Sequence, residues 1–260
     1  MPKLNKNTYF SAKNKYLSNS KVKDFAKDKA YFFKKHILGD FVKPKKADPL
    51  IIGSAADLWL TSSEKDFREK YTIVSKRDST ALNYEYQLNP TMYQKVEDLC
   101  KIVKAQSAYK ALKGHKTQKI LQYDMPIGDH FIGLCGVPDW IKIKGTHAVI
   151  TDLKTSNNVD PSKYFWTCVK FDYFQQLANY RKLTYLNFPE VETIDCQHLV
   201  VDSTNELHPV YTVKFTQTEI DKAEDILNQY IDLISIEKEF LPRNVSWDDA
   251  IMIGQSDEDL

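Results

Sequence analysis

The central pattern of this 260-residue chain is FIGLCGVPDWIKIKGTHAVITDLKTS, residues 131–156. It contains three β-rich runs, one of which delivers Asp152, Leu153 and Lys154. Because residues two apart in a strand point to the same face, Asp152 and Lys154 share a face and Leu153 points into the core. If Asp139 faces them from a neighbouring hairpin strand, the group suits a hard cation and an activated water molecule. The competing interpretation is a β-hairpin that carries an ordinary surface Asp-Lys pair.

Two further elements flank this pattern. Downstream, Gln176 and Tyr180 are spaced i, i+4 and therefore lie on one face of an expected helix, with Gln175 as the alternative register. Upstream, the segment 53–57, GSAAD, predicts a helix whose small residues allow close packing on the sheet. The ordered set of four elements is more specific than any one of them.

In this order the elements resemble the core of the PD-(D/E)XK nuclease superfamily, in which Gly-x-Pro-Asp precedes Asp-x-Lys. The Gln-Tyr helix makes the chain similar to the branch that holds RecB-type nuclease domains, lambda exonuclease and RecE. The resemblance covers roughly residues 18–215. It implies an α/β fold with a restriction-endonuclease-like core, in which helices flank a central mixed β-sheet.

The resemblance also implies roles for individual residues. Asp139 and Asp152 would hold Mg²⁺ or Mn²⁺ together with the backbone carbonyl of Leu153. Asp57 stands where the family usually has His, and its hard oxygen is an acceptable substitute ligand, although it could instead be an exposed helix residue. The catalytic set implied by the family is Asp139, Asp152, Lys154, Gln176 and Tyr180.

Some positions near this set stay open. Relatives often carry a Glu on the strand near residues 117–126, where Gln122 or Asp124 could face the site in one of two registers. Lys154 lies beside two anions, which would keep it charged, so electrostatic stabilisation suits it better than general base catalysis. Residues 128–130 are expected to form a hairpin turn, and His130 fits a turn residue better than a metal ligand.

Periodicity and breakers predict the remaining elements. We expect a linker at residues 39–49 with Pro44 and Pro49 as breakers, and a capping box at Thr216 and Glu219. Helices are expected at about 18–33, 53–60, 90–112, 164–183 and 216–241. Strands are expected at about 117–126, 131–136, 140–143, 148–151, 197–201 and 210–213.

Charge is balanced overall, with a net charge of +1, but it is unevenly distributed. Residues 1–46 hold thirteen lysines against three aspartates, and residues 101–119 hold six lysines and no acidic residue. Basic faces beside an acidic metal site favour a polyanionic partner. The alternative is a set of solvated helix faces.

Length and composition predict one nuclease domain, 1–260, with a basic N-terminal segment at 1–46 and a C-terminal helix and tail at 216–260. The tail carries Trp247 and the acidic residues 257–259. No signal peptide or membrane-spanning run is evident, so we expect the cytoplasm of a bacterial or phage-infected cell. The scattered cysteines fit buried or free thiols rather than an iron–sulfur cluster: Cys100, Cys135, Cys168 and Cys196.

The resemblance therefore implies a metal-dependent DNA exonuclease of the RecE and lambda type, acting in phage-type recombination or end processing. Its expected partner is DNA, with a single-strand annealing protein and further copies of the chain as candidates. Two other functions stay open: a structure-specific endonuclease or CRISPR-adaptation-type nuclease, and a catalytically reduced DNA-binding protein.

Overall fold

The computed structural model describes residues 3–9, 15–39, 45–128, 130–157, 159–203 and 207–240. Trp247, the acidic residues 257–259 and residues 40–44 of the expected linker lie outside the described residues. The helices are α1 (Lys6–Tyr9), α2 (Asn19–Lys27), α3 (Lys29–Phe32), η1 (Phe33–Leu38), α4 (Asp48–Thr61), α5 (Glu64–Lys70), η2 (Tyr84–Tyr86), α6 (Pro90–Ala105), α7 (Ser107–Lys110), α8 (Pro161–Lys170), α9 (Tyr173–Asn187) and α10 (Gln217–Phe240). The strands are β1 (Thr72–Ile73), β2 (Gln87–Leu88), β3 (Lys116–Thr117), β4 (Leu121–Ile127), β5 (His130–Gly136), β6 (Trp140–Lys144), β7 (His147–Ser156), β8 (Thr193–Asp202) and β9 (Val210–Lys214).

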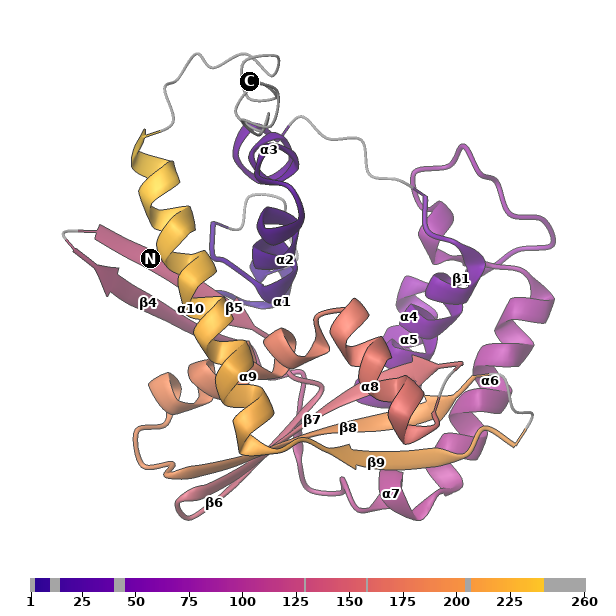
Figure 1. The fold of residues 1–260 in the computed structure, drawn as a ribbon. Helices are drawn as coiled ribbons and strands as arrows, with labels where there is room; N and C mark the ends of the chain where they lie inside the picture. The colour runs from indigo at the N-terminus through magenta and orange to yellow at the C-terminus, as the bar shows by residue number, and fades with distance from the viewer. Residues whose placement is uncertain are drawn as a thin grey trace, which may run out of the picture.

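A five-stranded sheet in the order β3-β6-β7-β8-β9 forms the centre of the fold (Figure 1). The pairs β3–β6, β6–β7 and β8–β9 are antiparallel, whereas β7 and β8 run parallel over ten residues each. Parallel neighbours need a crossover connection, and α8 and α9 supply it. The expected central mixed sheet flanked by helices is confirmed.

Two apolar clusters cover opposite faces of this sheet. Ala148 and Ile150 of β7 pack in one cluster with α2, α9 and α10. Leu153, one strand position out of phase, packs in the other cluster with α4 and α6. The alternation along β7 therefore places Asp152 and Lys154 on the α9 face and points Leu153 into the opposite core, as the sequence predicts.

The expected first strand, residues 117–126, does not join the central sheet as one piece. Lys116 and Thr117 pair with β6, whereas β4 pairs with β5 in a separate two-stranded sheet. Between them Gln118 has a φ angle of 48°, in the left-handed region, where few residues other than glycine are found. This backbone conformation separates β3 from β4, which the strand periodicity of the sequence does not reveal.

Three expected helices are divided. The helix at 18–33 is interrupted at Asp28, whose extended backbone separates α2 from α3. The helix at 90–112 ends at Ala105, and a short α7 begins at Ser107. The helix at 164–183 is split into α8 and α9 at Asp172, whose φ angle of 55° interrupts the helical hydrogen bonds. Pro49 lies in the first turn of α4, which begins at Asp48, and does not end a helix there. The backbone N–H that a proline lacks has no helical acceptor in the first turn.

The capping box that opens α10 is confirmed. The Glu219 backbone N–H donates to Oγ1 of Thr216 at 3.3 Å, and the Thr216 N–H donates to Oε2 of Glu219 at 3.2 Å. All four cysteines are buried, and within the described ranges none of them forms a disulfide. None of the helices in the described ranges combines the length and apolar character that a membrane crossing requires.

Gly136 ends β5 at a point where α9 approaches the backbone closely. A Cβ atom added there would lie 2.9 Å from Cδ1 of Tyr180 and 3.0 Å from Cδ1 of Leu183. Both partners are buried, with exposed fractions of 6% and 0%. The glycine of the Gly-x-Pro-Asp pattern is therefore needed for the contact between the hairpin and α9.

We predict that Gly136→Ala destabilises the fold by about 1–3 kcal/mol, the usual cost of overpacking a closed core. Chemical denaturation would measure this loss. Lys222→Ala, at an exposed position of α10, is the control and should leave the stability unchanged. Equal stability of the Gly136→Ala variant and the original protein would contradict the assigned packing.

Candidate active site

Four of the predicted site residues form one hydrogen-bonded chain on the α9 face of the sheet. The Lys154 ammonium group pairs with Oδ2 of Asp152 and donates to Oε1 of Gln176 at 2.9 Å. Nε2 of Gln176 donates to the Tyr180 hydroxyl at 2.8 Å and lies 3.4 Å from Oδ1 of Asp152. The structure therefore brings Asp152, Lys154, Gln176 and Tyr180 together, and it selects Gln176 over the alternative register at Gln175.

Asp139 approaches this chain from the bend that precedes β6. Because Trp140 pairs with Thr151, antiparallel geometry sets Asp139 opposite Asp152. Oδ2 of Asp139 accepts from the backbone N–H of Leu153 at 2.7 Å, within β7 itself. Asp139 and Asp152 are both buried, with exposed fractions of 8% and 3%. The hairpin thus holds two carboxylates beside the Leu153 peptide.

Gln118 completes the surroundings of Asp139, and the sequence did not single it out. Its Nε2 donates to Oδ1 of Asp139 at 2.9 Å and to Oγ1 of Thr61 at 3.1 Å. Its backbone N–H donates to the Asp139 carbonyl at 3.1 Å. The left-handed φ angle of Gln118 makes both contacts possible, and a strained residue beside a candidate site is a functional signal. Only the three-dimensional structure provides this signal.

Asp57 reaches the same region from α4, on the other side of β7. Gly53 lets this helix approach, since its Cα faces Oγ1 of Thr155. Oδ1 of Asp57 is buried and has no hydrogen-bond partner among the described residues. A buried, unpaired carboxylate oxygen is costly in an empty site. It is therefore a suitable position for a cation ligand.

The electrostatics of the carboxylates agree with this geometry. Burial raises the pKa of Asp57 to about 7, and the neighbouring charge of Asp152 adds to the shift. Burial, Asp57 and Asp152 together raise the pKa of Asp139 well above its usual range. Neighbouring negative charges make these carboxylates harder to ionise, so a nearby positive charge is needed to stabilise their ionised forms. Lys154 supplies a single positive charge for several carboxylates.

The charge of Lys154 is set by opposing effects. Its burial would lower the pKa, but Asp152 and Tyr173 outweigh burial, and the net pKa is raised. The ammonium nitrogen also lies 4.4 Å from the ring centroid of Tyr173, the first residue of α9. Lys154 therefore stays protonated, which suits charge stabilisation and not general base catalysis.

The residues fit a divalent cation in donor chemistry, although they do not form a finished cage. Carboxylate and carbonyl oxygens are the ligands that Mg²⁺ and Mn²⁺ prefer. Within the described ranges, no three His, Cys, Asp or Glu side chains are grouped so that they could hold a metal ion together. The orphaned oxygen of Asp57 and the mutual repulsion of the carboxylates are the observations that favour a cation here.

The two open candidates on the strand near residues 117–126 contact other groups. Nε2 of Gln122 donates to the Tyr16 hydroxyl at 3.1 Å, and its Oε1 accepts from the Leu4 backbone. Asp124 also interacts with Tyr16, whose pKa is raised to about 12 by burial and then by this carboxylate. Both side chains thus contact residues of the N-terminal segment. The side chain of His130 lies outside the described part of the chain.

His198 lies on β8, next to the candidate site, and the sequence did not indicate a role for it. It is fully buried on β8, opposite Asp152, and its Nδ1 shares a hydrogen bond with the Tyr164 hydroxyl at 2.8 Å. Burial and the charge of Lys154 lower its pKa well below the usual range, so the imidazole stays neutral. A neutral ring here supports Tyr164 without adding charge next to Lys154.

The two lysine-rich segments, residues 1–46 and 101–119, differ in how many of their lysines form ion pairs. In the N-terminal segment, Lys23 pairs with Asp172 at 3.1 Å and Lys35 pairs with Asp24 at 2.7 Å. In the second segment five lysines are exposed to solvent and Lys119 is half-buried. The exposed ones are Lys101, Lys104, Lys110, Lys113 and Lys116. This second surface is the more available to a polyanion.

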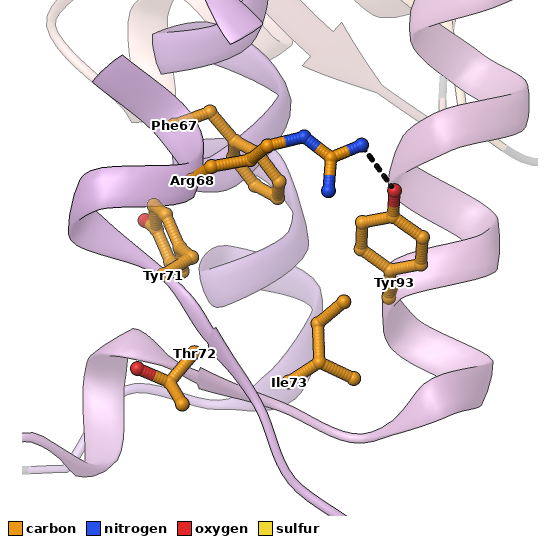
Figure 2. A pocket seen from close by; sticks show the side chains of 6 residues that line it. All are labelled: Phe67, Arg68, Tyr71, Thr72, Ile73 and Tyr93. Carbon is orange, nitrogen blue, oxygen red and sulfur yellow. Dashed lines mark hydrogen bonds between the residues drawn. The ribbon is translucent and has the colours of Figure 1, made fainter. Parts of the chain in front are cut away.

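A surface pocket of about 270 Å³ lies between α5 and α6 (Figure 2). Arg68 is its charged group, but the guanidinium already donates to Glu64 at 2.7 Å and to the Tyr93 hydroxyl at 3.3 Å. The pocket lacks the acid and amide groups of the hairpin. It is lined by Phe67, Arg68, Tyr71, Thr72, Ile73 and Tyr93.

Comparison with protein families gives one match over most of the chain. The profile of the family described as "PDDEXK-like domain of unknown function (DUF3799)" matches residues 18–240. This range contains every residue of the candidate site. No curated protein matches the chain significantly.

Solved structures give a similar fold. A crystal structure described as a "putative exonuclease" from Eubacterium rectale aligns with a TM-score of 0.66 and 17% identity, covering 98% of this chain and 95% of that chain. A structure described as SSO0001 aligns with a TM-score of 0.32 and 14% identity, covering 86% and 89%, which is too low for any conclusion. The first match shows a shared fold over almost the whole chain.

The raised pKa of Asp57 predicts a pH-dependent stability when divalent ions are chelated. The folded state holds its proton more tightly than the unfolded state, so stability should fall as pH rises from about 4 to about 7. Asp57→Asn removes the titration. We expect its melting temperature at pH 8 to rise by about 2–4 °C, or about 1 kcal/mol in a domain of this size.

Thermal melts in EDTA across this pH range would measure both effects. Asp225→Asn, a change on the exposed side of α10, is the matched control and should keep the pH dependence of the original protein. A steeper decline in the Asp57→Asn variant would show that Asp57 is not the titrating group.

Proposed function

Since the chain belongs to the family of PDDEXK-like domains and thereby to the PD-(D/E)XK superfamily, we propose that it is a metal-dependent deoxyribonuclease that degrades DNA from an end. The observation that carries the proposal is the hydrogen-bonded chain of Asp152, Lys154, Gln176 and Tyr180, set opposite Asp139. It supplies acidic, basic and amide groups in one place. Phosphodiester hydrolysis needs these groups to hold a cation and to stabilise a charged phosphate.

The proposed cation ligands are Asp57, Asp139, Asp152 and the carbonyl of Leu153. Mg²⁺ or Mn²⁺ bound there would neutralise charge on the phosphate and lower the pKa of a water molecule. The protein holds this region ready through Gln118 and the Leu153 N–H, which orient Asp139 by hydrogen bonds of 2.9 and 2.7 Å. Fixed ligands of this kind lose little freedom when the ion binds.

Lys154 is the proposed contact to the scissile phosphate. Its protonated state provides a donor and a positive charge where negative charge develops. Gln176 holds the ammonium group through Oε1, while Tyr180 accepts from the other end of the same amide. This arrangement supports a role of Gln176 and Tyr180 in orienting Lys154, and their alternative role is to orient the phosphate. A second contact of Gln176, to Asp152, links the lysine to the acidic side.

Digestion from an end is proposed by analogy. Two observations favour it: the resemblance to RecE and lambda exonuclease, and the fold shared with the Eubacterium rectale protein described as a "putative exonuclease". The same analogy suggests a role in phage-type recombination, an annealing protein as partner, assembly with further copies of the chain and a cytoplasmic location. It also suggests that residues 1–260 form one nuclease domain.

We predict that Asp152→Asn and Lys154→Met each lower Mg²⁺-dependent DNA cleavage by at least about 100-fold, because each removes a charge needed in the transition state. These changes keep the side-chain volume, but each leaves the other charge of a buried ion pair without its partner, which costs about 3–5 kcal/mol. Thermal melts of both variants therefore accompany the assay, to separate a loss of folding from a loss of chemistry. Initial rates on end-labelled duplex DNA would measure the effect. Asp225→Asn is the control, and undiminished cleavage by purified Asp152→Asn protein would refute the site.

Substrate topology separates the candidate activities. With Mg²⁺, an exonuclease degrades linear duplex DNA and leaves a covalently closed circle intact, because a circle offers no end. We expect this result on a gel of both forms, with labelled strands that report the polarity. Nicking of the circle would indicate an endonuclease, and a mobility shift without products would indicate a DNA-binding protein.

A further inference from the structure

Helix α8 exposes apolar residues to solvent on the side that faces away from the sheet. It buries Tyr164 and Cys168, with exposed fractions of 2% and 0%, against β8. Its outer side presents Trp166, which is 68% exposed, together with Phe165 at 41%. Surface helices normally expose polar residues, and grouped apolar side chains on a surface mark a binding site. The aromatic face, as used below, consists of Phe165, Trp166, Val169 and Phe171.

This aromatic face continues into the candidate site. The ring of Phe171 stacks on that of Tyr173 with centroids 5.7 Å apart. Tyr173 in turn lies under the Lys154 ammonium group at 4.4 Å. A ligand that lies on the aromatic face is therefore separated from the proposed phosphate contact by only two side chains.

Lysines surround the aromatic face. Lys163 and Lys170 are exposed on α8, and Nζ of Lys170 lies 5.6 Å from the Phe171 ring centroid. The nearby acids at the ends of α8 are already engaged: Asp160 caps the helix at the Ser162 N–H, and Asp172 pairs with Lys23. The face thus combines π-surfaces with positive charge, which suits a polyanion that also has flat apolar groups.

We infer that the aromatic face binds the unpaired bases of a single-stranded DNA end and so directs that strand to Lys154. This inference rests on the proposed function, and it adds a preference for ends with an overhang. Bases in a duplex are stacked on one another, and their edges are read by hydrogen-bonding groups, which phenyl rings lack. Unpaired bases expose their π-faces, on which Trp166 and Phe165 can stack.

The test measures equilibrium binding in EDTA, by fluorescence anisotropy, of a labelled duplex with a single-stranded overhang and of the same duplex with blunt ends. Trp166→Ala should weaken overhang binding by about tenfold, the usual loss for one stacking residue, and blunt binding by less than about twofold. Trp166→Phe should retain most of the overhang affinity. Phe131→Ala, at a 63% exposed aromatic residue of the separate β4–β5 sheet, is the matched control and should change neither.

Three results would overturn the inference: unchanged overhang binding by Trp166→Ala, an equal loss on both duplexes, or full rescue by Trp166→Leu, which keeps apolar area without an aromatic ring. Sedimentation of the Trp166→Ala protein adds a fourth, since dissociation of an oligomer would make this face a contact between copies of the chain. Binding in EDTA needs no cleavage, so the inference can fail while Asp152→Asn still abolishes activity. Conversely, a protein that prefers overhangs but has no nuclease activity would contradict the proposed function and leave the inference about the aromatic face intact.

Discussion

The hydrogen bond from the Leu153 N–H to Asp139 is the contact on which the candidate site depends. It uses a backbone group of the central strand β7 to orient a side chain that the hairpin delivers from β6. A side-chain contact would shift with rotamer changes, whereas a peptide group inside a sheet is fixed by its neighbours. The two buried carboxylates therefore keep their spacing as long as the β6–β7 pairing is intact. The remaining groups are arranged around this pair.

The site concentrates negative charge at a cost to stability. Burial and neighbouring negative charge raise the pKa of Asp57 on α4 and of Asp139 in the hairpin, and the buried Lys154 ammonium group pairs with Asp152 on β7. An arrangement of this kind lowers the free energy of unfolding, and a cation that binds to it would raise the free energy of unfolding again. Buried ion pairs are poor stabilisers in general, so a buried pair beside further carboxylates with raised pKa values favours a chemical role over a structural role.

The sequence predicts the parts of the site that follow from local periodicity. Alternation along β7 places Asp152 with Lys154, and the i, i+4 spacing places Gln176 with Tyr180, because each pair lies within one element. Gln118 was not predictable, since its role arises from a left-handed backbone conformation and from contacts with Thr61 and Asp139. The same conformation explains why β4 leaves the central sheet, and a second left-handed residue, Asp172, divides α8 from α9.

The parallel pairing of β7 with β8 has a consequence for biosynthesis. The two strands meet only after the intervening helices α8 and α9 exist, and the site collects groups from residue 57 to residue 180 (Figure 1). Contacts so distant along the chain form late, because long loops must close before any pairing energy is gained. A nascent polypeptide that ends before α9 lacks Gln176 and Tyr180. The hydrogen-bonded chain from Asp152 to Tyr180 is therefore completed only after translation has passed α9.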